Sequence, residues 1–351
     1  MKKITFVKAI NDALHIAMKK DSKMLCYGLG VTDPKAVFGT TENLEKKFGK
    51  KRVFDTPTSE NAMTGVAIGA ALDGIRSVTT HQRLDFFLLA MDQLVNSAAK
   101  WFYMFGGKKP VPITIRLIIG RGWGQGPTHS QNLQAWFAHI PGLKVVMPSS
   151  PADAKGLLLS SIFDANPVLF LEHRWLHNSY GFVKNGDTRV ILGKAKIIKK
   201  GKDVTVVSMS YLTTEAIRAI KFLEKHKVNC ELIDLRSIKP MDWKTISKSI
   251  SKTGRLLVLD TGFSNISVAS EIISRASMEK FNELKIPPYK LAMPDVPEPT
   301  SFALTKNYYI NANKIAKTIL TMLNKKSGFL KELTDQKTPH DVPGSWFKGP
   351  F

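Results

Sequence analysis

Three kinds of side chain that could do chemistry stand where predicted strands end. Glu60 lies between the turn-forming Thr-Pro-Thr-Ser run at 56–59 and the apolar helical segment VAIGAALDG. Phe86 and Phe87 follow the strand SVTTH, and His129 lies in GPTHSQ after the strand VPITIRLII. Glu60 is either a surface helix charge or an acid held inside a site. Spacing alone does not decide whether these side chains form a binding site. The alternative is that Phe86 and Phe87 are core aromatics and His129 is a surface histidine.

The elements that must position these side chains alternate between strand and helix. Helical patterns at 61–74, 90–105 and 151–163 lie among five apolar runs, MLCYGLG, SVTTH, VPITIRLII, LKVVMPS and PVLFLE. This alternation predicts an α/β fold with an open, parallel, doubly wound sheet. Ligands of such sheets bind where the strands end, and Glu60 and His129 lie at such ends.

A second α/β unit follows the first. Strands are expected in DVTVVSMS, NCELIDL, RLLVLDT and KLAMP, with helices near 213–226, 242–252 and 266–280. The Gly- and Lys-rich residues 186–200 are expected to form a linker. The sequence therefore predicts two doubly wound domains, at 1–185 and 201–325.

The C-terminal tail, 326–351, is polar and rich in Pro and Gly but carries Trp346, Phe347 and Phe351. Such a tail either frays or docks on a partner through its aromatic rings.

Composition limits the classes of function. The formal charge is +22, but the lysines are scattered and greatly outnumber the arginines, which favours lysine bias or an acidic protein partner over nucleic acid. No apolar run reaches membrane-spanning length, and Lys8, Asn11 and Asp12 interrupt any signal-peptide core, so we expect a cytoplasmic protein. The two cysteines, Cys26 and Cys230, are expected to be buried.

Other motifs have plainer interpretations. GRGWGQG (120–126) is neither a dinucleotide fingerprint nor a phosphate loop, and it favours a backbone turn close to a ligand. In EHRWLH, Glu172 lies outside the pair His173 and His177, which disfavours zinc. Gly65 and Gly69 indicate close helix packing.

The segments TPTSE, MDQLVNSAAK, HSQ, PGLKVVMP and DAKGLL, taken together, strongly resemble the β subunit of thiamine-diphosphate-dependent 2-oxo acid dehydrogenases. The resemblance runs from about residue 4 to about 322. It implies that the first domain binds the cofactor's aminopyrimidine and that the second is a transketolase C-terminal-like domain. Glu60 would hydrogen-bond the pyrimidine nitrogen, with Gln82 in contact with the cofactor and Phe86 stacked on the ring. His129 would bind the substrate carboxylate or the acyl group.

The resemblance also concerns metals and partners. In some members a structural potassium ion is held by positions that match Ile113, Ser161, Asp164 and Asn166. The family holds Mg²⁺ and the diphosphate with a GDG motif, which this chain lacks. The resemblance therefore implies an α subunit that carries the magnesium half of the site, in an assembly of two α and two β chains. The chain alone should be inactive.

Departures from the family bear on the substrate. Leu29-Gly30 stand where relatives commonly have an acidic pair, and His81 and Arg83 stand where many have apolar or aromatic residues. These two are candidates for a substrate pocket, in which Arg83 would pair with a carboxylate, phosphate or hydroxylated substrate. The alternative, which the sequence favours, is that Arg83 lies on the surface at a strand end. The basic chain also departs from relatives whose acidic β subunits dock a basic domain of a lipoyl acyltransferase.

Three functions remain in consideration. The leading one is a dehydrogenase β subunit that, with its α subunit, decarboxylates a 2-oxo acid and passes the acyl group to a lipoyl group. The second is the C-terminal half of a split transketolase-like enzyme that transfers ketol units between sugars. The third is a non-catalytic scaffold, against which the joint presence of Glu60, Phe86 and His129 argues.

Overall fold

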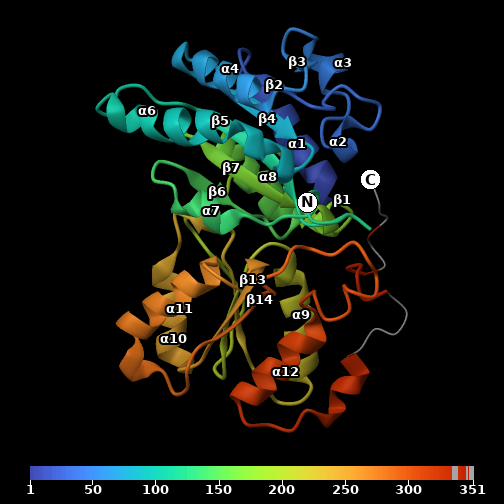
Figure 1. Cartoon of the computed structure of the whole chain (residues 1–351), viewed down its shortest axis with the longest axis vertical. Helices are drawn as coiled ribbons and strands as arrows, with labels where there is room; N and C mark the ends of the chain where they lie inside the picture. The colour runs from blue at the N-terminus through green and yellow to red at the C-terminus, as the bar shows by residue number, and fades with distance from the viewer. Residues whose placement is uncertain (123, 334–338, 345–346, 348–351) are drawn as a thin grey trace. The chain divides into compact units, whose positions relative to one another are not determined.

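The computed structural model describes residues 1–122, 124–333, 339–344 and 347 (Figure 1). The described chain forms two compact units. The first unit contains Met1–Leu192, Ile238–Pro240 and Phe347, and the second contains Gly193–Ser237 and the described residues of 241–344. Both are α/β units, which confirms the predicted fold class.

The first unit is built on a seven-stranded sheet in the order β12-β6-β7-β5-β4-β2-β3. Gly28 at the end of β2 lies in register with Thr80 of β4 and Asp55 of β3, and every pairing from β6 to β3 is parallel. These strands therefore end at one edge of the sheet. The strands are β2 (Leu25–Gly28), β3 (Val53–Asp55), β4 (Ser77–His81), β5 (Ile113–Ile119), β6 (Lys144–Val146), β7 (Val168–His173) and β12 (Ser237–Lys239).

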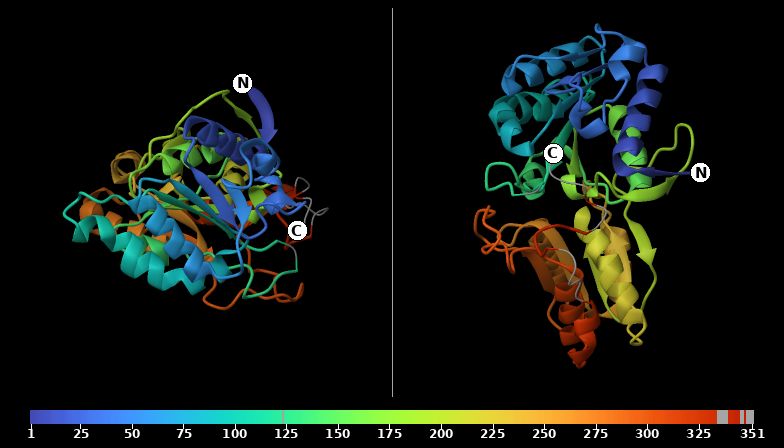
Figure 2. Two further views of the ribbon diagram at one scale, coloured as in Figure 1. Left: turned by 90° about the horizontal axis from the view of Figure 1, so that it is seen from above. Right: turned by 90° about the vertical axis from the view of Figure 1, so that its right-hand side faces the viewer.

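Helices cover both faces of this sheet (Figure 2). On one side α1 (Phe6–Lys20) packs against α8 (Pro151–Ile162), and α8 contacts β5 and β7. On the other side α4 (Glu60–Leu72) contacts β4 and β5. The smaller elements are α2 (Ala36–Gly39), α3 (Leu44–Phe48), α5 (Leu84–Phe87), α7 (Gln134–His139), η3 (Arg174–Leu176) and the antiparallel pair β1 (Lys2–Thr5) and β8 (Tyr180–Val183).

The single helix expected at 90–105 is divided. It consists of a 3₁₀ turn, η1 (Leu88–Ala90), a π-helical stretch, η2 (Gln93–Ala98), and α6 (Ala99–Met104). The π-helical stretch widens the helix locally, which no hydrophobic period reveals.

The second unit has a five-stranded sheet in the order β14-β13-β10-β11-β9. In Figure 1, α10 and α11 lie on one side of it and α9 and α12 on the other. The strands are β9 (Lys196–Lys199), β10 (Thr205–Ser208), β11 (Glu231–Asp234), β13 (Leu256–Phe263) and β14 (Tyr289–Met293). The helices are α9 (Tyr211–Glu224), α10 (Trp243–Thr253), α11 (Val268–Glu279), α12 (Ala312–Met322), η4 (Phe281–Glu283) and η5 (Gly328–Leu333).

Five strands were not expected: the short β1, β3 and β8 of the first unit, together with β9 and β12. The segment 186–200, predicted as a linker, contains β9, which pairs antiparallel with β11. Its exposed lysines masked the strand pattern, because an edge strand of this kind buries little. The strand β12 follows β11 in the chain but belongs to the first sheet.

Several smaller expectations can be compared with the structure. Cys26 and Cys230 are both fully buried and unpaired, as predicted. Phe347 is half-buried, with the Arg174 guanidinium 5.7 Å from its ring centre, whereas Trp346 and Phe351 lie outside the described residues. Over the described ranges, no helix has the length and apolar character needed to cross a membrane.

The start of α8 yields a stability prediction. The Ser150 hydroxyl caps the helix by accepting a hydrogen bond from the Asp153 backbone N–H at 3.2 Å, and Pro151 occupies the first turn. Replacing Ser150→Ala should lower the free energy of unfolding by about 1 kcal/mol, measured by urea denaturation, because the N–H loses its acceptor. Ser150→Gly is the matched control and should cost only a few tenths of that. Equal losses in the two variants would contradict the capping role.

Candidate active site

The described site gathers at the edge where β2, β3, β4 and β5 end. Glu60 is the first residue of α4, which follows β3 after a short turn. Its side chain is buried, with the residue 3% exposed, and its backbone carbonyl accepts a hydrogen bond from the Thr64 hydroxyl at 2.8 Å. The Glu60 carboxylate forms no hydrogen bond with any other residue that the structure describes. Glu60 is thus a buried acid and not a surface helix charge.

Asp55 holds the loop after β2 beside this acid. Its carboxylate accepts hydrogen bonds from the Val31 N–H at 2.6 Å and from the hydroxyl of Thr32, also at 2.6 Å. Gly30 in this loop has a φ of +74°, and a Cβ there would lie 2.4 Å from the Gln82 amide nitrogen. The Gln82 side chain therefore lies directly against Gly30, and a larger residue at this position would displace it.

Phe86 and His129 are in contact. Their ring centres are 5.2 Å apart and their planes are perpendicular. The Phe86 residue is 38% exposed, so part of the ring remains open. The Thr128 hydroxyl lies 3.1 Å from the Nδ1 of His129. A half-open aromatic ring beside a histidine can stack on a flat ligand and offer a proton donor or acceptor to a neighbouring group.

The loop that carries His129 is tied to the segment after β4. The Arg83 guanidinium donates to the Gly120 carbonyl at 3.0 Å and to the Gln125 side-chain oxygen at 2.5 Å. The Gln131 amide donates to the Asp85 carboxylate at 2.9 Å. Arg83 is only 4% exposed, so the favoured surface position is wrong. The glycine-rich loop folds over Arg83 and supplies acceptors for its charge.

The other substrate-pocket candidate, His81, is buried below the site. It is 1% exposed, and its ring centre lies 4.8 Å from that of Phe87, with the two ring planes at 65°. Burial lowers the pKa of His81 to about 3, so the imidazole is neutral at physiological pH. Neither ring nitrogen has a hydrogen-bond partner in the described chain. This side chain offers no accessible surface to a substrate.

The sequence interpretation missed a buried ion pair in the middle of the sheet. Arg116 of β5 and Glu172 of β7 are both fully buried and lie 2.7 Å apart. Burial raises the pKa of Glu172, and the positive charge of Arg116 opposes that shift. A lone arginine within the apolar run ITIRLII was the available signal, because a charge inside a buried strand needs a partner.

The neighbouring histidines of EHRWLH do not form a metal site. His173 presses on Gly120, where a Cβ would lie 2.3 Å from its Nε2, and His177 stacks on Phe6 with ring centres 6.1 Å apart. Burial lowers the pKa of His173 to about 3. Among the described residues no group of three His, Cys, Asp or Glu side chains could hold a metal ion.

One of the expected potassium ligands, Asp164, is engaged with cations of the chain itself. Both carboxylate oxygens of Asp164 accept from the Lys144 ammonium, at 2.8 and 2.6 Å. Arg76 donates to the backbone carbonyl oxygens of Ile162 and Asp164. The Ser161 hydroxyl donates to Leu157. The Asp164 carboxylate and the carbonyl oxygens of Ile162 and Asp164 are thus already paired with Lys144 and Arg76. The potassium site expected at Ile113, Ser161, Asp164 and Asn166 stays a prediction.

Comparison with known proteins agrees with this architecture. The family model "Transketolase, pyrimidine binding domain" matches residues 2–178, and "Transketolase, C-terminal domain" matches residues 193–315. A solved structure described as a split gene transketolase, inactive β4 tetramer, aligns with a TM-score of 0.74 and covers 92% of this chain and 99% of its own. At 21% identity that likeness concerns the fold alone. These matches define a transketolase-like protein of two domains.

Sequence relatives show to which family of transketolase-like proteins the chain belongs. The pyruvate dehydrogenase E1 component subunit beta of Rhizobium meliloti is 40% identical over 307 residues, covering 87% of this chain and 67% of its own. The acetoin:2,6-dichlorophenolindophenol oxidoreductase subunit beta of Cupriavidus necator is 38% identical, covering 90% and 96%. The human mitochondrial pyruvate dehydrogenase E1 component subunit beta is 38% identical, covering 92% and 91%. The chain belongs to the family of β subunits of thiamine-diphosphate-dependent 2-oxo acid dehydrogenases.

The positioning residues around the site were not found from the sequence. Asp55 and Asp85 each hold a loop by accepting hydrogen bonds, and Gln125 accepts from Arg83. Asp55 directly precedes Thr-Pro at a strand end, a setting in which a carboxylate commonly accepts backbone N–H groups. No pattern in the sequence links Gln125 to Arg83, since the two meet only through the fold.

The buried His81 predicts a pH dependence. Its pKa in the folded chain is about 3, against 6.5 for a free histidine, so only the unfolded chain takes up this proton between those values. Stability should therefore fall as the pH drops below about 6.5. His81→Phe should flatten this slope by up to about 1.4 kcal/mol per pH unit, measured by urea denaturation from pH 7.5 to 5. The exposed His139→Gln is the control; an unchanged slope in His81→Phe would contradict the burial argument.

Proposed function

We propose that this chain forms the pyrimidine-binding half of a thiamine diphosphate site. With an α subunit it would oxidatively decarboxylate a 2-oxo acid and transfer the acyl group to a lipoyl group. One observation carries the proposal: Glu60 follows β3, and Gln82 and Phe86 follow β4. These two parallel strands flank β2 and end at one edge, where His129 contacts Phe86. The family membership supplies the reaction class.

The side chains at this edge fit an aminopyrimidine ring. The Glu60 carboxyl group is buried, and its oxygens are not used by the described chain, so it can share a proton with a ring nitrogen in one hydrogen bond. The half-exposed Phe86 ring offers a stacking surface, and the exposed Gln82 amide offers both donors and acceptors. These properties support the assignment of Glu60, Gln82 and Phe86 as cofactor-binding residues.

Thiamine diphosphate, when bound, supplies an electron sink for decarboxylation. Glu60 would hold a proton at the pyrimidine ring nitrogen, and its burial strengthens that hydrogen bond because little water competes. His129 would bind the substrate carboxylate or the acyl group through its ring N–H. Its contact with Phe86 and the ties of its loop to Arg83 and Asp85 would keep it oriented.

The magnesium half of the site would come from the α subunit. The chain has no GDG motif, and the nearest string, Gly186-Asp187-Thr188, forms an exposed turn. Asp187 there accepts from Arg189 and Lys20, and these hydrogen bonds lower its pKa to about 2. A carboxylate committed to two cations of its own chain is a poor ligand for Mg²⁺. We therefore propose an assembly of two α and two β chains, with potassium left out of the mechanism.

Helix α4 supports the need for a partner chain. A helix that is apolar all round is normally covered on every side. The outer side of α4 carries Ala62, Val66 and Gly69, which are exposed, with Val66 at 59%. Gly65 packs near Gln93, but a Cβ at Gly69 would meet no described atom within 4 Å. This uncovered stripe of small and apolar residues suits close packing against a helix of another subunit.

The substrate can be identified by assaying candidate compounds side by side. The relatives are named for pyruvate and for acetoin, so both compounds belong in the first assay. Branched-chain 2-oxo acids complete the panel. The buried Arg83 already has two acceptors within the chain, which argues against a direct role in binding a substrate anion.

Glu60→Gln tests the catalytic assignment. The variant should co-purify with the α subunit like the wild type but lose turnover by at least about 100-fold, because an amide cannot share the proton that a carboxylate holds. Turnover is measured as reduction of lipoamide, which also separates a dehydrogenase from a sugar ketol transferase. Calorimetry of thiamine diphosphate with Mg²⁺, on the chain alone and on the complex, is the companion measurement. Wild-type activity in Glu60→Gln, or the absence of cofactor binding to the complex, would contradict the proposal.

Gly69→Leu tests the subunit contact. The side chain has room in the isolated chain, so the unfolding temperature of the variant should stay within a few degrees of the wild type. Co-purification with the α subunit should fall by at least about ten-fold, because a leucine prevents the close approach of two helices. Lys314→Leu, on the exposed side of α12, is the matched control. Normal assembly of Gly69→Leu would show that α4 is not at the interface.

A further inference from the structure

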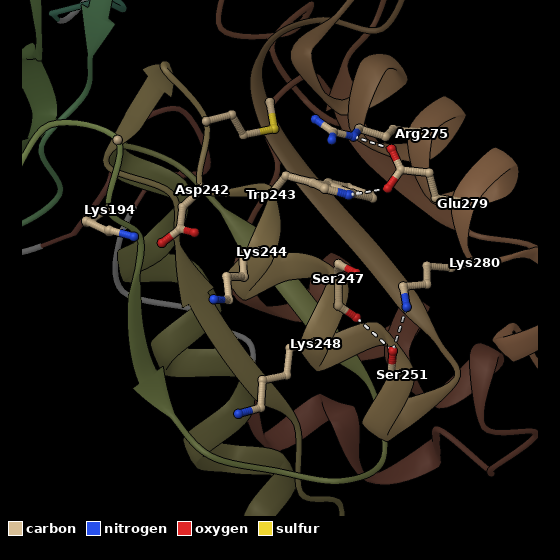
Figure 3. A pocket seen from close by; sticks show the side chains of 12 residues that line it. Lys194, Asp242, Trp243, Lys244, Ser247, Lys248, Ser251, Arg275, Glu279 and Lys280 are labelled. Atoms are coloured by element: carbon tan, nitrogen blue, oxygen red, sulfur yellow. Dashed lines mark hydrogen bonds and ion pairs between the residues drawn. The ribbon is translucent and has the colours of Figure 1, made fainter.

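A groove in the second unit carries a marked excess of positive charge. It has a volume of about 760 Å³ and lies along α10, between the C-terminal turn of α11 and the chain before β9 (Figure 3). Five of its lining residues are basic: Lys194, Lys244, Lys248, Arg275 and Lys280. Only two are acidic. The groove belongs to neither the sheet edge of the first unit nor the residues assigned to the cofactor.

Both acidic side chains of the groove are already engaged. Asp242 caps α10 by accepting from the Thr245 N–H at 3.2 Å, and it also accepts from the Ala195 N–H at 3.1 Å. Glu279 accepts from the Trp243 indole N–H and from Arg275, both at 2.6 Å (Figure 3). These bonds orient the two carboxylates toward their donors. Lys280 pairs with Glu283, which is not part of the lining, so the lysines left without a countercharge in the described chain are Lys194, Lys244 and Lys248.

The unpaired charge is concentrated on one side of α10. Lys244, Ser247, Lys248 and Ser251 follow the i, i+3, i+4, i+7 spacing of a single helix face, and Lys244 and Lys248 extend from the same side of the helix in Figure 3. Lys194 adds a third ammonium from outside the helix. None of these three lysines has an ion-pair partner within the part of the chain that the structure describes.

The groove also has an ordered apolar part. The Arg275 guanidinium lies over the Trp243 ring, 4.5 Å from its centre, and Glu279 holds both residues in place. The side chain of Met241 lines the same groove. A fixed aromatic ring and a thioether next to free ammonium groups can accept an apolar side chain flanked by carboxylates.

We propose that this groove docks an acidic peptide segment of a partner protein, whose carboxylates pair with Lys194, Lys244 and Lys248 while an apolar side chain packs on Met241 and Trp243. Charge complementarity favours this occupant, since the three unpaired lysines are exposed point charges along an open surface. A small anionic ligand would instead call for an enclosed pocket that buries most of its surface. An extended segment can reach all three lysines at once.

Fluorescence anisotropy on the full-length chain tests the proposal. The probe is a labelled oligo-glutamate peptide with one central leucine, titrated at about 0.1 M salt, where distant charges are screened. Lys244→Glu with Lys248→Glu should weaken binding roughly ten-fold or more, because two attractions become repulsions. Lys194→Glu, on a different segment, should also weaken it. An oligo-glutamine peptide of the same length should bind neither protein.

A control variant distinguishes docking in the groove from attraction of the peptide by the net positive charge of the chain. The double variant Lys314→Glu with Lys317→Glu makes the same charge change on the exposed side of α12. It should alter the affinity for the peptide less than two-fold, which is the effect expected from the change in net charge alone. Equal weakening in the two double variants would overturn the proposal, as would a peptide that fails to bind the wild type. Preferential binding of inorganic phosphate or an oligonucleotide, lost in the groove variant, would assign the groove to phosphate and also overturn it.

Discussion

The parallel register of β2, β3, β4 and β5 is the constraint on which the candidate site depends. Because Gly28, Asp55 and Thr80 lie side by side, the chain leaves these strands at one edge, whatever follows in the loops. Glu60, Gln82 and Phe86 are thereby brought together from segments that are distant in the sequence. Loop contacts then refine the positions: Asp55 holds the first loop and Arg83 the last.

The interior below this edge is unusually polar. The ion pair of Arg116 and Glu172 joins β5 to β7, and His81, His173 and His177 are buried around it as neutral rings. Such groups contribute little net stability, since burial costs them their hydration. Their packing against Phe87, Gly120 and Phe6 instead fixes where each strand end lies. The buried polar groups therefore serve to position the strand ends more than to stabilise the fold.

The sequence predicted the fold class well because hydrophobic period and turn residues are local signals. It placed strands such as β4 and β5 and helices such as α8 closely, and the family resemblance is confirmed. The burial of Arg83 was not predictable, since it depends on a glycine-rich loop folding back over the strand end. The strand β9 was hidden by exposed lysines, and β12 by its shortness. The burial of Arg83 and the place of β12 in the first sheet depend on contacts between distant segments, for which no sequence period exists.

The strand β12 has a consequence for how this chain can be divided. Ser237–Lys239 form the outermost strand of the first sheet next to β6, although they follow β11 of the second unit in the chain. The Lys239 ammonium also donates to the carbonyl oxygens of Ala138 and Ile140, at 2.8 and 2.9 Å, and so closes the end of α7. A fragment that stops at Leu192 would leave β6 as an open edge with unpaired backbone groups, which favours aggregation. The first unit is therefore not complete without a strand from the later part of the chain, so a gene fission near Leu192 would have to preserve that strand.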